Sequence, residues 1–196
     1  MNNVTAEKFQ EIQSGELGWW THANFNPQIE WKFYLDVFES HLRPFKRVVD
    51  IGCGPVPIFM NPKIEASEVT AVDPLWEEYL KLDKYTQWHT RPVDHHYADV
   101  DQAPSHQFDG VFFLNALDHV RCPKETLDGV QRILTCDGLL FLFVDIDKSI
   151  DYLHPHRLTQ SWLMMELAGM ETLVVKNNQS WKHKNRVVYY VGRKIT

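Results

Sequence analysis

Short apolar runs alternate along the chain with longer segments in which apolar residues recur every three or four positions. The short runs are rich in β-branched and aromatic residues and are typical of buried strands. They predict strands at residues 47–51, 68–74, 108–115, 139–144, 172–176 and 186–193, with a weak one at 91–93 that leads to 97–101. Apolar residues at helical spacing predict a helix at residues 28–42, and further helices are expected at 4–14, 76–84, 124–134 and 158–168.

Strands and helices alternate over most of the chain, and this order is typical of an α/β protein. The helix expected at 58–64 is cut short by Pro62, and residues 136–138 read as a turn. A polar link joins the last two strands, which we expect to pair as an antiparallel hairpin. The sequence therefore predicts a three-layer α/β/α sandwich around a mostly parallel seven-stranded sheet with this hairpin at its edge.

Residues 15–27 are predicted to form a loop because glycine, asparagine and proline are frequent there. The loop carries Trp19, Trp20 and His22, and such large side chains in a loop must pack on the core or meet a ligand. Two interpretations follow: a hydrophobic flap anchored on the domain, or a lid whose side chains face an active site. We divide the chain into an N-terminal lid segment, residues 1–45, and a main domain, residues 46–196.

Composition narrows the class of protein. The chain has 196 residues, of which 44% are hydrophobic, so it can form one domain with a sizeable core. Its net charge of -6 and lack of a long basic run argue against a nucleic-acid partner. No apolar run suggests a membrane span or a signal sequence, and the three cysteines are widely spaced. We expect a cytoplasmic protein with reduced thiols, and the oligomeric state stays open.

The most informative stretch is residues 47–57, a short strand that ends in a glycine turn. Gly52 and Gly54 allow a sharp turn and the close approach of a ligand. Such a turn binds a nucleotide-like ligand at the carboxyl edge of a sheet. Pro57 stands where a dinucleotide fingerprint needs its third glycine, so a nicotinamide or flavin dinucleotide is disfavoured. Asp73, at the end of the second strand, can accept hydrogen bonds from a ribose.

Several segments, in order, resemble class I S-adenosylmethionine-dependent methyltransferases. Residues 48–55 look like the first motif of that family, and residues 71–74 resemble its ribose-binding step. Further similar segments are 97–100, 108–120, 133–140 and 163–174, so the resemblance covers about residues 46–194. The sequence departs from the family at Val56, where many members carry a third glycine, and in its short first helix. The resemblance identifies residues 46–196 as a Rossmann-like domain that binds S-adenosyl-L-methionine.

The resemblance also implies roles for individual residues. Gly52 and Gly54 line the methionine part of the cofactor, and Asp50 orients the turn or contacts the amino group through water. Asp73 binds the ribose. The adenine is expected beside Pro74, Leu75, Asp99 and the amide of Val100, and the sulfonium beside Asn115 and Ala116. The implied activity is methyl transfer, and the alternative is a non-catalytic module that binds the cofactor and regulates a partner.

The acceptor is less well defined. A hydroxyl acceptor benefits from a general base, and His119 is the first candidate because its loop follows the strand ending near Asn115. Alternatively, the imidazole ring of His119 has a structural role and holds its loop by a hydrogen bond to the backbone. Residues 145–156 should lie on the same edge of the sheet, so His154 is a candidate acceptor contact. We expect a small-molecule acceptor, methylated on oxygen or nitrogen: a sugar, a metabolite hydroxyl or a small amine.

A metal site is also considered. Asp145, His154 and His156 are residue types that bind divalent ions, but their spacing matches no known signature. We therefore predict no metal site. A nicotinamide oxidoreductase remains the least favoured alternative, and it is separated from a methyltransferase by measuring which cofactor binds.

Overall fold

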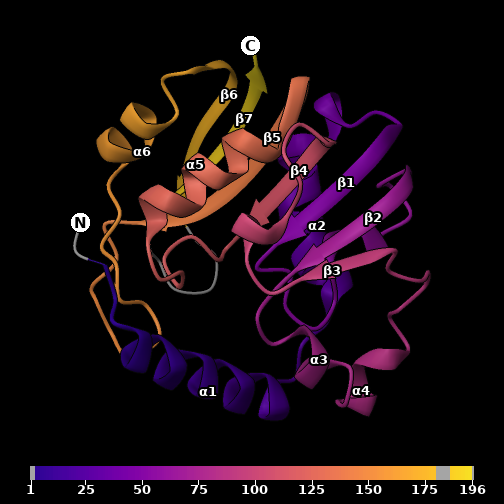
Figure 1. The fold of residues 1–196 in the computed structure, drawn as a ribbon, viewed down its shortest axis with the longest axis vertical. Coiled ribbons are helices and arrows are strands. Elements are labelled where there is room, and N and C mark those ends of the chain that lie inside the picture. The colour runs from indigo at the N-terminus through magenta and orange to yellow at the C-terminus, as the bar shows by residue number, and fades with distance from the viewer. Residues whose placement is uncertain (1–2, 180–185, 196) are drawn as a thin grey trace.

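The computed structural model describes residues 3–179 and 186–195, and within them seven strands form one sheet in the order β3-β2-β1-β4-β5-β7-β6 (Figure 1). The strands are β1 (Phe45–Ile51), β2 (Ala66–Val72), β3 (His95–Tyr97), β4 (Phe108–Leu114), β5 (Leu134–Ile146), β6 (Met170–Gln179) and β7 (Arg186–Lys194). The first five pair in parallel, and β7 runs antiparallel to both β5 and β6. The predicted mostly parallel sheet with an antiparallel C-terminal edge hairpin is confirmed.

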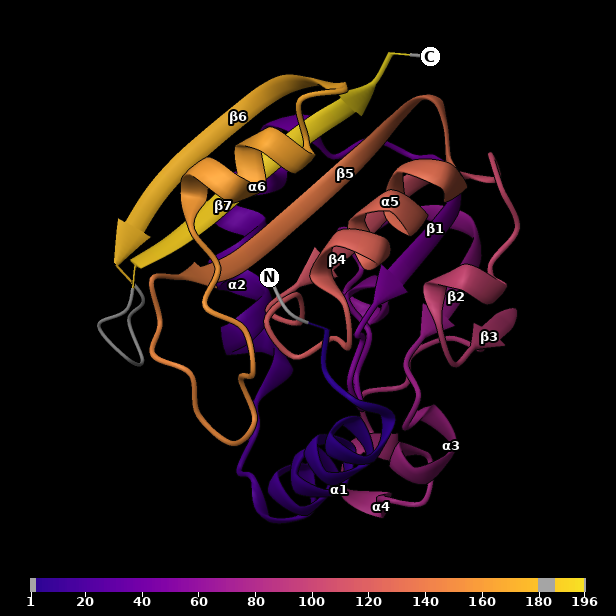
Figure 2. The same cartoon turned by 60° about the vertical axis from the view of Figure 1, so that its left-hand side comes forward.

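Helices cover both faces of the sheet. The helix α2 (Pro27–Phe38) lies on one face, and α5 (Pro123–Ile133) and α6 (Gln160–Glu166) lie on the other (Figures 1 and 2). Along β5, Leu140 and Leu142 join the core with α5 and α6, whereas Phe141 and Phe143 join the core with α2. Both faces are buried, which explains why this strand reads as a continuous apolar run.

The N-terminal helix α1 (Ala6–His22) is the main departure from the predicted structure. Residues 15–22 were expected in a loop, but they continue the helix that begins after Thr5, whose hydroxyl accepts a hydrogen bond from Lys8 N. Two glycines each cost about 1 kcal/mol relative to alanine in a helix. Contacts made by the rest of the helix offset this cost, because Ile12 is buried and Trp20 packs among aromatic rings.

Contacts in both halves of α1 attach it to the rest of the chain. At its C-terminal end, the Lys84 ammonium donates to the carbonyls of Thr21 and Ala23 at 2.9 and 2.8 Å. At its N-terminal end, the Tyr152 hydroxyl donates to the Glu11 carbonyl at 2.8 Å. The helix thus lies across the carboxyl ends of the parallel strands in both views of the ribbon (Figures 1 and 2).

Smaller corrections concern the segments between strands. The helix expected at 58–64 is one 3₁₀ turn, Ile58–Met60, since Pro62 cannot continue it. The helix expected at 76–84 is split into α3 (Trp76–Tyr79) and α4 (Asp83–Thr86). The other 3₁₀ turns are Glu39–His41 and Val100–Gln102, the first of which ends the predicted helix 28–42.

Two strand predictions also change. The weak strand expected at 91–93 lies instead at β3, where it pairs with β2. The turn expected at 136–138 is an irregularity within β5, where Asp137 has a φ of 59° and the pairing with β4 shifts register. The polar link between the last two strands lies mostly outside the described residues. Across the part of the chain that the structure describes, no helix is both long and apolar enough to cross a membrane.

Candidate active site

The glycine turn joins β1 to the 3₁₀ turn Ile58–Met60 and forms one end of the site. Gly52 and Gly54 have φ values of 61° and 59°, in the left-handed region that favours glycine. A Cβ on Gly52 would lie 2.3 Å from the Cβ of Ala116, so the turn and the loop after β4 are in contact there. The Gly52 amide donates to the Val72 carbonyl at 2.7 Å, which ties the turn to the end of β2.

Two buried carboxylates hold this turn in place. Asp73 Oδ2 accepts a hydrogen bond from Gly54 N at 3.0 Å, and its Oδ1 accepts one from Leu75 N at 2.9 Å. Burial raises the pKa of Asp73 to about 6, although both amide bonds act in the opposite direction. Asp50 Oδ2 accepts from Ile58 N at 2.7 Å, and burial raises its pKa to about 8. Asp50 therefore orients the far side of the turn.

A cavity of about 920 Å³ extends from this turn to the end of β5. Asp50, Asp73 and the turn glycines lie at one end of it, with Pro74, Leu75, Asn115 and Ala116. Asn115 has a φ of 57°, and its amide donates to the Phe143 carbonyl at 2.8 Å, which fixes the chain direction after β4. The cavity is large enough for a nucleoside-sized ligand together with a second small molecule.

Comparison with known protein families assigns the chain to one of them. A family model described as a methyltransferase domain matches residues 28–186. The chain belongs to this methyltransferase family. It is therefore an enzyme that transfers methyl groups, and its cofactor is S-adenosyl-L-methionine, as the resemblance of its motifs implied.

Individual relatives agree with this assignment. Two curated relatives are both named ubiquinone biosynthesis O-methyltransferase. The chain is 22% identical to that of Actinobacillus pleuropneumoniae over 76% of this chain and 68% of the relative, and 26% identical to that of Dechloromonas aromatica over 71% and 63%. A solved structure, 1,6-didemethyltoxoflavin-N1-methyltransferase of Burkholderia thailandensis with S-adenosylhomocysteine bound, superposes with a TM-score of 0.71 at 16% identity. That match covers 100% of this chain and 93% of the other and shows that the two share a fold.

Two features of the methyltransferase at this end of the cavity, the glycine turn and Asp73, are compatible with the cofactor. Both glycines have a positive φ, and a Cβ would lie 2.3 Å from Ala116 at Gly52 and 3.3 Å from the Trp20 indole at Gly54, so the turn needs glycine at these positions. Asp73 receives one amide hydrogen bond on each oxygen, and a carboxylate oxygen has capacity for two. Each oxygen of Asp73 therefore has capacity for a further hydrogen bond.

The other end of the cavity is polar and lies where three separate segments meet. His119, in the loop after β4, has Nδ1 2.8 Å from Glu16 Oε1 on α1. Its ring meets that of His154 at a centroid distance of 4.3 Å, and His154 Nδ1 lies 2.6 Å from Asp151 Oδ1. Burial lowers the pKa of His119, but the neighbouring carboxylates outweigh it, so the pKa is raised above its ordinary value of 6.5.

Asp118 and Lys148 complete this polar end. Asp118 is 2% exposed, and its Oδ1 is 3.7 Å from His119 Nε2. Lys148 Nζ lies 3.9 Å from Asp118 Oδ2 and 3.5 Å from Asp145 Oδ2. Donor atoms of Asp118, His119 and His154 gather within 4.8 Å, but the Lys148 ammonium already brings positive charge to this carboxylate.

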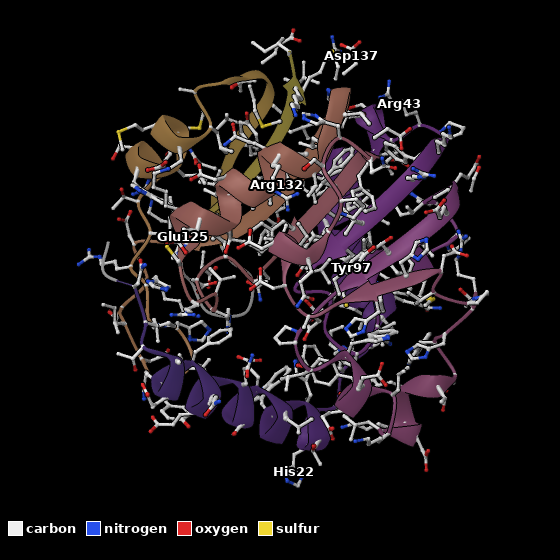
Figure 3. All side chains as sticks on the ribbon, in the orientation of Figure 1. His22, Arg43, Tyr97, Glu125, Arg132 and Asp137 are labelled. Carbon is white, nitrogen blue, oxygen red and sulfur yellow. The ribbon has the colours of Figure 1, made fainter. Side chains whose placement is uncertain are left out.

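The structure brings most of the predicted site residues to one cavity. Its lining includes every residue named above for the cofactor except Asp99 and Val100, together with Trp19, Trp20, His119 and His154. Asp99 caps the turn that follows it by accepting from Asp101 N, and Val100 is buried beside Gly129. His22 lies at the exposed end of α1 and points away from the sheet (Figure 3). None of these three lines the cavity.

Sequence reasoning missed Glu16, because residues 15–27 were assigned to a loop. A helical period was present: Ile12, Glu16, Trp19 and Ala23 are spaced by three or four residues and line the cavity together. The segment 145–156 was correctly placed beside the site, since Asp145, Lys148, Asp151 and His154 line it. His156 does not, and its Nε2 bonds the Val120 carbonyl at 2.7 Å.

Proposed function

We propose that this methyltransferase transfers the methyl group to a hydroxyl oxygen of a small molecule, with His119 as the general base. The observation that carries the proposal is the position of His119, which lines the same cavity as the glycine turn. A hydroxyl must lose its proton when it is methylated, whereas a neutral amine is already nucleophilic. The imidazole of His119, whose pKa is raised by neighbouring carboxylates against the lowering effect of burial, is well suited to take that proton.

The lining of the cavity supports a small acceptor with a flat apolar body. Tyr34, Phe143 and Tyr189 lie in edge-to-face contact at the base of the cavity, with ring centroids 5.0 and 4.9 Å apart. Trp19 and Trp20 of α1 also line this cavity. Aromatic walls favour a planar ring or a sugar face over a flexible chain. The names of the two curated relatives, both O-methyltransferases, agree with a hydroxyl acceptor.

The chemistry requires little beyond alignment and one proton acceptor. When bound, S-adenosyl-L-methionine supplies a methyl group already activated by its sulfonium. Asp73 and the turn glycines hold the cofactor, and Asn115 and Ala116 border the reacting centre. His119 Nε2 would take the proton that the acceptor hydroxyl loses when it receives this methyl group. The polypeptide acts by positioning both reactants and by excluding water.

Residues 1–45 contribute the cover of this site in the same proposal. The helix α1 crosses the open edge of the sheet, and Trp20 lies against Gly54: a Cβ there would be 3.3 Å from the indole. Trp20 also makes edge-to-face contacts with Phe25, Tyr79 and Tyr85. The aromatic segment is thus both packed on the domain and part of the cavity wall, which combines the two interpretations drawn from the sequence.

Methyl transfer to a panel of phenols, catechols and sugars, with a labelled methyl group, tests the proposal. We expect transfer to a hydroxyl acceptor, and His119→Ala should lower kcat about 100-fold. Binding of S-adenosylhomocysteine to this variant, measured by calorimetry, should stay within twofold of the wild type. His41→Ala, which alters a partly exposed histidine beside Ser40, is the matched control. Full turnover by His119→Ala, or labelling of amines only, contradicts the proposal.

A further inference from the structure

We propose that Glu16 of α1 is a positioning residue for His119, so that the N-terminal helix completes the base that activates the acceptor. The inference rests on the proposed function, since it assumes that His119 takes the acceptor proton. It adds a residue that lies 103 positions away in the sequence, on a segment outside the strands that bind the cofactor.

The Glu16 carboxylate lies beside Nδ1 of His119. The other ring nitrogen, Nε2, is the one proposed to take the acceptor proton. Glu16 Oε1 and His119 Nδ1 are 2.8 Å apart, the separation of a close ion pair, although Nδ1 makes no hydrogen bond of standard geometry within the described residues. Both side chains are about one-fifth exposed, at 19% and 20%, so solvent screens the pair only in part. A carboxylate at Nδ1 keeps a proton there and leaves Nε2 as the nitrogen that accepts a proton.

The position of Asp118 is consistent with Nε2 of His119 being the nitrogen that accepts the proton. Asp118 Oδ1 is 3.7 Å away, beyond hydrogen-bonding distance, so it leaves the Nε2 lone pair free. Within residues 3–179 and 186–195, the two Asp118 oxygens receive no hydrogen bond. A carboxylate so placed stabilises the imidazolium that forms when Nε2 takes a proton. Glu16 thus sets the tautomer, and Asp118 favours the product of the proton transfer.

His119 is surrounded by charged groups from three segments. Glu16 comes from α1, Asp118 from the loop after β4, and Lys148 and His154 from the loop after β5. Burial and Lys148 lower the pKa of His119, whereas Glu16 and Asp118 raise it, and the raising effect prevails. Removing the charge of Glu16 alone should therefore lower this pKa.

The same arrangement makes the base depend on the docking of α1. Glu16 lies between the two attachments of the helix, the Tyr152 bond to the Glu11 carbonyl and the Lys84 bonds to its last turn. The position of the carboxylate is thus fixed by contacts that also close the cavity. An acceptor meets an active base only where α1 covers it, which reduces exposure of the reacting centre to water.

Kinetics of Glu16→Gln against pH test the inference. We expect kcat to fall at least tenfold while the KM for the acceptor changes less than threefold. His119 must be neutral to act as a base, so kcat rises as pH passes its pKa. This rise should move to lower pH in Glu16→Gln, because the charge that raises the pKa is gone. Glu16→Asp should recover part of kcat.

The matched control is Glu11→Gln, which removes an exposed carboxylate of the same helix paired with Lys8 at 3.0 Å. It should behave as the wild type in kcat and in pH profile. Melting temperatures of all three variants separate lost folding from lost positioning. The inference is overturned if Glu16→Gln keeps the kcat and the pH profile of the wild type.

A second measurement needs no turnover. The ring nitrogen shifts of His119, assigned by their loss in His119→Gln, report its tautomer and its pKa by NMR. Glu16→Gln should lower that pKa and reduce the population protonated only at Nδ1, and unchanged values contradict the pairing. If the pairing holds by NMR but the wild type labels no hydroxyl acceptor, the proposed function fails and the contact stands. If hydroxyl transfer occurs and Glu16→Gln resembles Glu11→Gln in both measurements, only the inference fails.

Discussion

The two ends of the cavity are built in different ways. At the cofactor end, backbone amides of the glycine turn and of the segment after β2 bond the carboxylates of Asp50 and Asp73. At the acceptor end, carboxylates meet side-chain cations and rings instead, as Glu16 does with His119. The first end depends on strand termini whose positions the sheet fixes. The second depends on side chains from three segments that only packing brings together.

This difference explains what each end specifies. Parallel strands end side by side, so the turn after β1 and the residue after β2 meet at a constant geometry that suits one cofactor. The acceptor end can change with α1 and the loop after β5 without disturbing the sheet. Under the proposed function, backbone conformation specifies the cofactor, whereas side chains on α1 and the loop after β5 select the acceptor.

The largest effect is expected from Gly52→Ala. The new Cβ would clash with Ala116 at 2.3 Å, and the φ of 61° is strained for any L side chain by about 1–2 kcal/mol. We expect affinity for S-adenosylhomocysteine, measured by calorimetry, to fall more than about 100-fold. Gly18→Ala, a helical glycine with open space around it, should bind normally and stabilise the fold. Normal binding by Gly52→Ala would show that the turn is not decisive.

Asp73→Ala comes next. It removes the proposed ribose contact and the acceptor of two amide hydrogen bonds, so cofactor affinity should fall at least tenfold. Asp109 is the matched control, because its carboxylate also accepts from two amides, those of Lys46 and Arg47, near the amino end of β1. Asp109→Ala should lower the melting temperature without changing affinity. Equal affinity losses in the two variants would assign Asp73 a structural role alone.

The smallest effect concerns the pH dependence of stability through Asp50. Its pKa is about 8 in the folded protein and near 3.8 when exposed, so between these values the folded state holds a proton that the unfolded state releases. Stability therefore falls as pH rises through this range. Asp50→Asn cannot titrate, and its amide oxygen can still accept from Ile58 N.

From pH 6 to pH 8 the variant should lose about 1–2 kcal/mol less stability than the wild type, a difference of several degrees in melting temperature. His119 titrates in both proteins, so its contribution cancels in the comparison, whereas Asp73, whose charge raises the pKa of Asp50, is coupled to the substituted group. Parallel melting curves against pH for the two proteins would show that Asp50 is charged in the fold, and would weaken the view that burial dominates this end of the site.

The success of the sequence-based predictions also differs between the strands of the sheet and the helix α1. Strands were found because β-branched and aromatic runs at 48–51, 108–115 and 139–144 are buried on both faces. Helix α1 was cut short in the prediction because Gly15 and Gly18 signal a break locally. In the fold, Gly15 instead lets the helix pass close to Tyr152, since a Cβ there would lie 2.7 Å from that ring. Local propensity was overridden by a contact 137 residues away.

By itself the sequence determined the fold class, the glycine turn and the cofactor, because these depend on patterns contiguous in the chain. Tertiary structure alone decided that Glu16 joins His119 and His154 in one cavity, and that His22 lies outside it. Proton transfer depends on distances of about 3 Å between side chains. Such distances are set by how α1 and two loops pack on the carboxyl edge of the sheet, which no local period in the sequence encodes.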